Sequence, residues 1–214
     1  MFTRSVYMIN RLFFRTNAHT IIPFLKSQAA TGSGHPRFSL NSIVALPETL
    51  ILPLNDDVIR LSLLNIDVPI LDEKVKSRFL LYFTPAYTGK QPHSLIVETL
   101  REIRERLLTA SPQKQLLDNL DRAACNYENS GFFSQFDWCI DHWGTSDDIE
   151  GVTESTFELP TAFIEFATVA APPIIALQQL ANIFPSVVFT LQYRLASESD
   201  WNEVQFYPFP PFGY

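Results

Sequence analysis

The sequence contains only 2 cysteines and 7 glycines among its 214 residues. Two cysteines cannot build the disulfide framework of a small secreted domain, and no Cys-x-x-Cys motif is present. Cys125 and Cys139 both fall in segments with a helical pattern, so we expect them to be buried, small apolar side chains. No apolar run reaches the roughly 18–20 residues of a membrane-spanning helix. We therefore expect no contact with a membrane, and the cytoplasm as the compartment.

Basic residues are also scarce, because 16 Lys and Arg stand against 23 Asp and Glu, for a net charge of −7. A protein that binds nucleic acid through its phosphates needs a basic surface. The sequence therefore predicts no general nucleic-acid binding, although a nucleic-acid-binding module stays open as an alternative. The apolar fraction of 46% is high enough for a buried core and argues against disorder.

Acidic residues are absent before Glu48, whereas five basic residues occur there. This composition is typical of a mitochondrial transit peptide. The alternative is a folded strand over Tyr7–Arg15, which its aromatic and β-branched residues favour and whose apolar residues form no clean helical stripe. We favour the strand, and we expect Phe2–Arg15 to remain in the mature protein.

Hydrophobic spacing and turn residues predict an α+β protein, with an antiparallel sheet that carries its helices on one face. Expected strands are Tyr7–Arg15, Phe38–Val44, Val152–Leu159, Thr161–Val169, Ser186–Arg194 and an edge strand Trp201–Tyr207. Expected helices are Thr20–Gln28, Leu95–Leu108, Gln113–Asn126, Phe132–Trp143 and Ile174–Phe184. We expect Phe189, Leu191 and Tyr193 to face the helices. The whole chain, 1–214, is predicted to be one domain, with 55–91 as an insertion and 208–214 as a proline-rich aromatic tail.

One stretch of the sequence could carry chemistry. Asp141, His142 and Asp147 lie close together in sequence, and a metal-dependent enzyme that uses these three residues is one alternative. However, the spacings of an EF-hand, of a His-Glu-x-x-His zinc site and of a Gly-x-Ser-x-Gly nucleophile are all absent. Cys139 precedes His142 by three residues, but the surrounding carboxylates oppose formation of a thiolate. We therefore predict no catalytic residue, no metal site and no cofactor.

Two aromatic runs resemble the signatures of a known family. Residues 136–145 read FDWCIDHWGT and residues 166–173 read FATVAAPP. They are similar to the WCIxxWGTKW and FxTAWSPP runs of the YubB-type ferredoxin-like family, which plasmids, phages and other bacterial mobile elements carry. Residues 38–50 resemble a further run of that family. This sequence departs from the family's pattern at Ser146–Asp147, where the family has Lys-Trp, and at Ala170, where it has Trp.

The resemblance implies a ferredoxin-like sheet without an iron–sulfur cluster, which usually requires four thiolates. The signature residues expected to be structural are Trp138, Trp143, Gly144, Thr145, Pro172 and Pro173. Together with the acidic composition, the resemblance implies an accessory or anti-defence protein of a mobile element that acts by binding a host protein. Aromatic anchors suited to an interface are Trp201, Phe206, Tyr207, Phe209, Phe212 and Tyr214. The identity of the partner and the oligomeric state stay open.

Overall fold

The computed structural model describes residues 7–15, 20–27, 38–50, 93–110, 114–158 and 162–208. The chain forms two compact units: residues 1–45 with 139–214, and residues 46–138. The predicted insertion 55–91 and the tail residues 209–214 lie outside the described residues. The assignment of the whole chain to one domain therefore stays a prediction.

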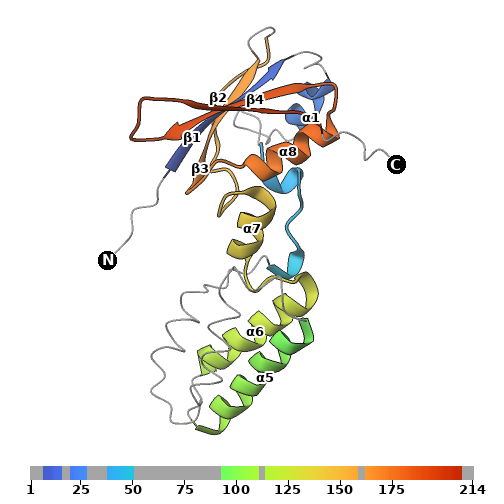
Figure 1. Cartoon of the computed structure of the whole chain (residues 1–214), viewed down its shortest axis with the longest axis vertical. Coiled ribbons are helices and arrows are strands. Elements are labelled where there is room, and N and C mark those ends of the chain that lie inside the picture. Colours follow the sequence, from blue (N-terminus) through green and yellow to red (C-terminus); the bar gives the residue numbers. More distant parts are fainter. Residues whose placement is uncertain are drawn as a thin grey trace. The chain divides into compact units, whose positions relative to one another are not determined.

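The first unit is built on a five-stranded antiparallel sheet (Figure 1). Its strands are β1 (Tyr7–Arg15), β2 (Val152–Thr156), β3 (Phe163–Val169), β4 (Val188–Leu195) and β5 (Asn202–Phe206). They lie in the order β2-β3-β1-β4-β5, so β1 is the central strand. Leu12 of β1 lies opposite Ile164 on one side and Leu191 on the other. The order is consistent with a ferredoxin-like sheet to which β5 is added at an edge, and the predicted α+β class is confirmed.

Two helices, α1 (Ile22–Ser27) and α8 (Ile174–Ile183), cover one face of this sheet. Alternate residues of β1 and β3 are buried, as expected of strands whose successive side chains point to opposite faces. The core joins the strand residues Leu12, Phe14, Ile164, Phe166, Phe189 and Leu191 to Leu177, Leu180 and Ala181 of α8, with Ile22 and Phe24 of α1 packed against them. Phe189 and Leu191 thus face the helices, as the sequence predicted.

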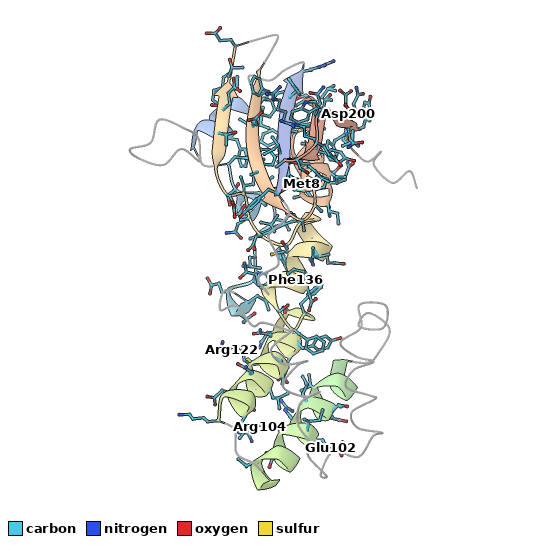
Figure 2. The ribbon with its side chains drawn as sticks, turned by 90° about the vertical axis from the view of Figure 1, so that its left-hand side faces the viewer. Met8, Glu102, Arg104, Arg122, Phe136 and Asp200 are labelled. Atoms are coloured by element: carbon cyan, nitrogen blue, oxygen red, sulfur yellow. The ribbon has the colours of Figure 1, made fainter. Side chains whose placement is uncertain are left out.

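The second unit contains a pair of contacting helices, α5 (His93–Ala110) and α6 (Lys114–Ser130). Figure 2 labels Arg104 on α5 and Arg122 on α6. Two ion pairs join the helices: Arg104 Nε lies 2.6 Å from Asp121 Oδ1, and Arg101 Nη2 lies 3.1 Å from Glu128 Oε2. A short 3-10 turn, η3 (Glu48–Leu50), also belongs to this unit. None of the described helices combines the length and the apolar character that a membrane span requires.

The helix α7 (Gln135–Trp143) contributes residues to both units, with Trp138 counted in the second and Cys139 in the first. Trp138 and Trp143 are buried, with 4% and 1% of their surface exposed. The apolar side chains of this helix are only partly buried, because Phe136 and Ile140 are exposed.

The predicted strand Phe38–Val44 is wrong, because this segment forms a 3-10 turn, η2 (Leu40–Ser42). The backbone N–H groups of this segment donate to carbonyl oxygens within the segment and to a carboxylate that is distant in sequence, instead of to a neighbouring strand. The N–H of Ile43 donates to Leu40 O at 2.9 Å, and the N–H of Leu40 donates to Asp148 Oδ1 at 2.7 Å. A strand pattern in the sequence cannot reveal a side-chain acceptor that lies this far along the chain.

The two cysteines differ in their surroundings. Cys139 is fully buried, as expected, but Cys125 on α6 is exposed, so the prediction for Cys125 is wrong. The inward positions of this part of α6 belong to Ala123, Ala124 and Tyr127. Helical periodicity turns the intervening Cys125 toward solvent.

The central place of β1 leads to a prediction about the N-terminal segment. Deletion of residues 1–15 removes the strand that pairs with both β3 and β4, so we expect the cooperative urea-unfolding transition of the first unit to disappear. Deletion of residues 1–6, which precede β1, is the control and should preserve the transition.

Intact-mass measurement on native protein should find Tyr7–Arg15 present; a mature start near residue 30 would contradict the strand and support a transit peptide.

Candidate functional site

The residues of the two signature runs, which are distant in sequence, come together in the first unit. Trp143 ends α7, and its Nε1 donates to the carbonyl oxygen of Val44 at 2.9 Å. Thr145 is fully buried, and its Oγ1 donates to the carbonyl oxygen of Val169 at the end of β3, at 2.7 Å. These two hydrogen bonds tie the end of α7 both to the segment after η2 and to the sheet.

Gly144 allows the close approach that this junction requires. Its φ is +84°, and its N–H donates to Cys139 O at 3.1 Å and to Ile140 O at 3.2 Å, which ends the helix. A Cβ atom at this position would lie 3.3 Å from the backbone N of Ile174 and 3.4 Å from Pro172 O. Only glycine combines this left-handed conformation with such tight contact to the backbone at the start of α8.

The turn from β3 to α8 is itself strained at Ala170, a non-glycine residue with a φ of +69°. Such a conformation costs roughly 1–2 kcal/mol for a residue with a side chain. Hydrogen bonds hold the turn: Thr168 Oγ1 donates to Ala171 O at 2.8 Å, and Asn10 Nδ2 donates to Thr168 Oγ1 at 2.9 Å. Pro173 is buried at the N-cap of α8.

The carboxylate of Asp148 holds the segment around η2 through several hydrogen bonds. Its Oδ2 accepts from Ser39 Oγ at 2.5 Å, and its Oδ1 accepts from the N–H groups of Leu40 and Ile149, each at 2.7 Å. Bonds to an ionised carboxylate are stronger than those between neutral groups. Asp148 therefore acts as a structural clamp on η2.

A groove of about 360 Å³ lies beside this junction. We call it the isoleucine groove; its lining residues are Ile175, Gln179 and Ile183 of α8, Asp141 and His142 of α7, and Ile43 and Val44 of the segment after η2. Ile175 is 41% exposed and Ile183 is 54% exposed. The neighbouring residues Ile140 and Ile174 are exposed as well. The groove thus offers aliphatic side chains to solvent, with one carboxylate and one imidazole at its wall.

Of the three residues of the metal-dependent alternative, Asp141, His142 and Asp147, the structure brings only the first two into contact. His142 Nδ1 lies 3.4 Å from Asp141 Oδ2, but Asp147 is not a lining residue of the groove. Within the described ranges, no three His, Cys, Asp or Glu side chains form a group that could hold a metal ion. Cys139 is fully buried, so it is not presented to a substrate.

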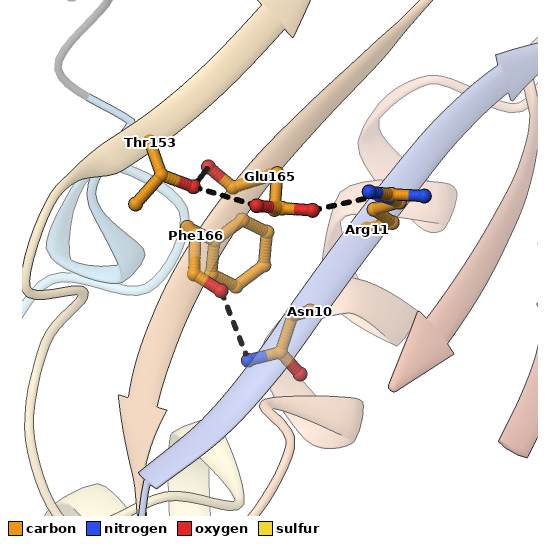
Figure 3. A network of polar contacts seen from close by, with 5 residues as sticks. All are labelled: Asn10, Arg11, Thr153, Glu165 and Phe166. Atoms are coloured by element: carbon orange, nitrogen blue, oxygen red, sulfur yellow. Dashed lines mark hydrogen bonds and ion pairs between the residues drawn. The ribbon is translucent and has the colours of Figure 1, made fainter. Parts of the chain in front are cut away.

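The face of the sheet away from the helices carries charged and aromatic side chains. Arg11 alternates with the buried Leu12, and its Nε lies 2.7 Å from Glu165 Oε2. Figure 3 shows Glu165 between Arg11 and Thr153, whose Oγ1 donates to Glu165 Oε1 at 2.9 Å. The guanidinium carbons of Arg11 and Arg194 lie 5.1 Å and 4.9 Å from the centroid of Trp201.

The predicted aromatic anchors have different environments. Trp201 is half-buried under the two arginines, and Phe206 belongs to the core with 2% of its surface exposed. Tyr207 is 60% exposed, and its carbonyl oxygen accepts from Gln178 Nε2 of α8 at 2.6 Å. The anchors Phe209, Phe212 and Tyr214 lie outside the described residues. Of the anchors that the structure describes, Tyr207 is the one most available for a partner.

The sequence analysis missed the groove residues on α8. Ile175, Gln179 and Ile183 are spaced by four, on a different side of the helix from the core residues Leu177 and Leu180. Two isoleucines eight residues apart, outside the core-facing positions of a short helix, are the signal that could have identified Ile175 and Ile183.

Comparison with known proteins finds no match, since no protein-family model, no curated protein and no solved structure is similar to this chain. Its function must therefore be inferred from the chemistry of its own residues.

Trp143 gives a prediction about the junction. Because its side chain is almost fully buried and donates to Val44, Trp143→Ala should lower the free energy of unfolding by about 3–5 kcal/mol. Trp143→Phe keeps much of the buried volume but loses the Nε1 donor, so it should cost less. Urea denaturation of the three proteins measures both effects, and an unchanged midpoint for Trp143→Ala would show that the residue is not part of the core.

Asp147 gives a prediction about pH. Partial burial raises the pKa of the Asp147 carboxyl, and the nearby Glu150 and Asp148 add to the effect. Because the folded chain holds this proton more tightly than the unfolded chain, the protonated carboxyl favours folding at low pH. That favourable contribution to the free energy of unfolding is lost as the pH rises through the folded pKa. At neutral pH the charged Asp147 thus opposes folding, and Asp147→Asn should raise the melting temperature.

The gain from Asp147→Asn should shrink as the pH falls through the raised pKa of the folded chain, and it should vanish below the unfolded pKa of about 4, where the carboxyl is protonated in both states. Asp200→Asn, on the exposed loop before β5, controls for the general effect of removing a negative charge. Thermal unfolding across acidic and neutral pH checks the prediction. A gain from Asp147→Asn that is independent of pH, or equal to that of Asp200→Asn, would contradict this account.

Proposed function

We propose that this chain is a non-enzymatic protein-interaction module and that the isoleucine groove is its binding site. The observation that carries the proposal is the exposure of Ile175 and Ile183, at 41% and 54%, in a groove rather than at scattered surface positions. Contiguous apolar surface on a folded protein marks an interaction site, whereas single exposed apolar residues need no explanation. Ile140 and Ile174, which precede the lining residues Asp141 and Ile175 in the sequence, are exposed as well.

The polar groups of the groove support binding better than catalysis. Asp141 and His142 contact each other at 3.4 Å, and the other lining side chains, apart from the amide of Gln179, are aliphatic. An active site brings together a nucleophile or ligand set with groups that stabilise developing charge. The metal-dependent alternative needs Asp147 beside Asp141 and His142, and Asp147 is not among the lining residues.

The open face of the sheet gives less support to a nucleic-acid-binding module. Arg11 is paired with Glu165, and Arg194 lies over Trp201 and donates to the carbonyl oxygen of Glu198. Both cations are therefore occupied within the protein. A strand of nucleic acid would require cations that can contact its phosphates.

The resemblance to the YubB-type family suggests the biological setting of this proposal. We propose that the chain belongs to that family and acts in the bacterial cytoplasm as an accessory or anti-defence protein of a mobile element. Its partner would be a host protein. The acidic composition of the chain would contribute to recognition, because complementary charge accelerates association and discriminates between partners.

The proposal predicts that one substitution in the groove abolishes partner capture. Immobilised protein should retain a host protein from bacterial lysate, and Ile183→Asp should lose it, because a carboxylate would then be placed in the apolar contact. Leu108→Asp is the matched control, since Leu108 is an aliphatic residue of similar exposure, 45%, outside the groove. With the purified partner, calorimetry should give an affinity loss of about tenfold or more for Ile183→Asp alone, at least 1.4 kcal/mol.

Two further measurements test the other contributions. Affinity should fall with added salt if acidic residues take part, because salt screens exposed charges. Deletion of Pro208–Tyr214 should weaken binding while leaving unfolding cooperative if the aromatic tail contributes.

The result that would contradict the proposed function is a metal-dependent turnover that Asp141→Asn or His142→Ala removes and Ile183→Asp leaves intact. That result would replace the binding module with an enzyme.

A further inference from the structure

We infer that the occupant of the isoleucine groove is an amphipathic helix of the partner, with aliphatic anchors along one side and a lysine or arginine that pairs with Asp141. This inference rests on the proposed function and names the chemistry of the partner. Three observations carry it: the spacing of the groove residues on α8, the separation of these residues from the core, and the charge around Asp141.

The spacing fits a helical ligand. Ile175, Gln179 and Ile183 are four residues apart and form a line along α8. Eight residues of helix rise about 12 Å, a little over two turns. A helix that lies in a groove presents its anchors at positions i, i+3 or i+4, and i+7, over the same length. Ile43 and Val44 supply aliphatic contacts from outside α8.

The groove stripe of α8 is separate from the stripe that packs on the sheet. Ala176, Leu177, Leu180 and Ala181 are fully buried and form the core contact of the helix. Folding of the first unit therefore does not require Ile175 or Ile183 to be buried. An aliphatic ligand would cover side chains that the fold leaves in solvent, which gives a favourable hydrophobic contribution.

The charge around the groove selects a cationic ligand. The side chain of Asp141 is 66% exposed, and its contact with His142 leaves room for a second partner. The first unit, residues 1–45 with 139–214, contains ten acidic and six basic residues, and Asp141 is the one charged carboxylate among the lining residues of the groove. Arg194 lies over Trp201, so it is engaged at the open sheet face. If two copies of this chain packed groove against groove, the two Asp141 carboxylates would face the same interface, which disfavours self-association.

A displayed peptide library tests this inference directly. The probe is a phage library of helical peptides of about 18 residues, ~27 Å long, in which aliphatic, acidic and basic residues vary freely. Selection uses the full chain, with Ile183→Asp protein as the counter-selection. We expect enrichment of peptides with aliphatic residues at helical spacing and with Lys or Arg beside them. Enrichment of acidic or proline-rich extended peptides, or none that depends on Ile183, would overturn the inference.

The enriched peptide then identifies the groove and the charge contact. Fluorescence anisotropy should show binding that Ile183→Asp weakens by about tenfold or more, whereas Leu108→Asp leaves it unchanged. Asp141→Asn should weaken binding less and should reduce its dependence on salt. An Asp141→Asn protein with unchanged affinity and unchanged salt dependence would contradict the basic contact.

Two other occupants would also overturn the inference. Concentration-dependent dimerisation that Ile183→Asp abolishes would identify a second copy of the chain. Peptide binding that appears only after deletion of Pro208–Tyr214 would identify the chain's own C-terminal segment. If no peptide is enriched but Ile183→Asp still loses the lysate partner, the basic helical ligand is rejected and the proposed function is retained. If no peptide is enriched and Ile183→Asp also keeps the lysate partner, both the helical ligand and the proposed function are rejected.

Discussion

The contact between the Trp143–Thr145 turn and the turn from β3 to α8 is the constraint on which the isoleucine groove depends. Thr145 Oγ1 donates to Val169 O at 2.7 Å, and the missing side chain of Gly144 lets the backbone of Ile174 approach. This contact fixes the last turn of α7 beside the first turn of α8. Because the two helix ends are fixed there, Asp141 and Ile175 can line the same groove. A larger residue at position 144 would be strained at its φ of +84° and would place a Cβ 3.3 Å from Ile174 N, so the two helix ends would have to shift apart by a few tenths of an ångström.

The third side of the groove depends on polar contacts made outside it. The carboxylate of Asp148 holds the backbone of Leu40, and Trp143 Nε1 holds the carbonyl oxygen of Val44. Both bonds use groups that are partly or fully removed from water, where leaving a partner unpaired is costly. The aliphatic side chain of Ile43 is thereby kept in place without a regular strand.

The parts of the fold that were predicted correctly are those whose signal is local. Alternation of apolar residues identified β3 and β4, and aromatic and β-branched residues favoured β1. Apolar residues at helical spacing identified α5, and turn residues at both ends delimited α8. The failure at Phe38–Val44 came from Asp148, since a carboxylate 108 residues away takes the donor of Leu40. The groove was missed for a different reason. Ile175 and Ile183 are of a residue type that usually belongs to the core. Only the structure shows that Leu177 and Leu180 fill the core position of α8 and that Ile175 and Ile183 stay exposed.

The size of the groove bears on how strongly it can bind. Complete burial of an isoleucine side chain contributes ~1.5–3 kcal/mol, so covering the exposed parts of Ile175 and Ile183 contributes less than that for each. Association costs an estimated 4–15 kcal/mol in lost translational and rotational freedom. A ligand that touched these two side chains alone would bind weakly. Strong binding therefore needs at least one further contact beyond these two side chains. Two linked weak contacts exceed the affinity of either alone, because the second forms at a high effective concentration.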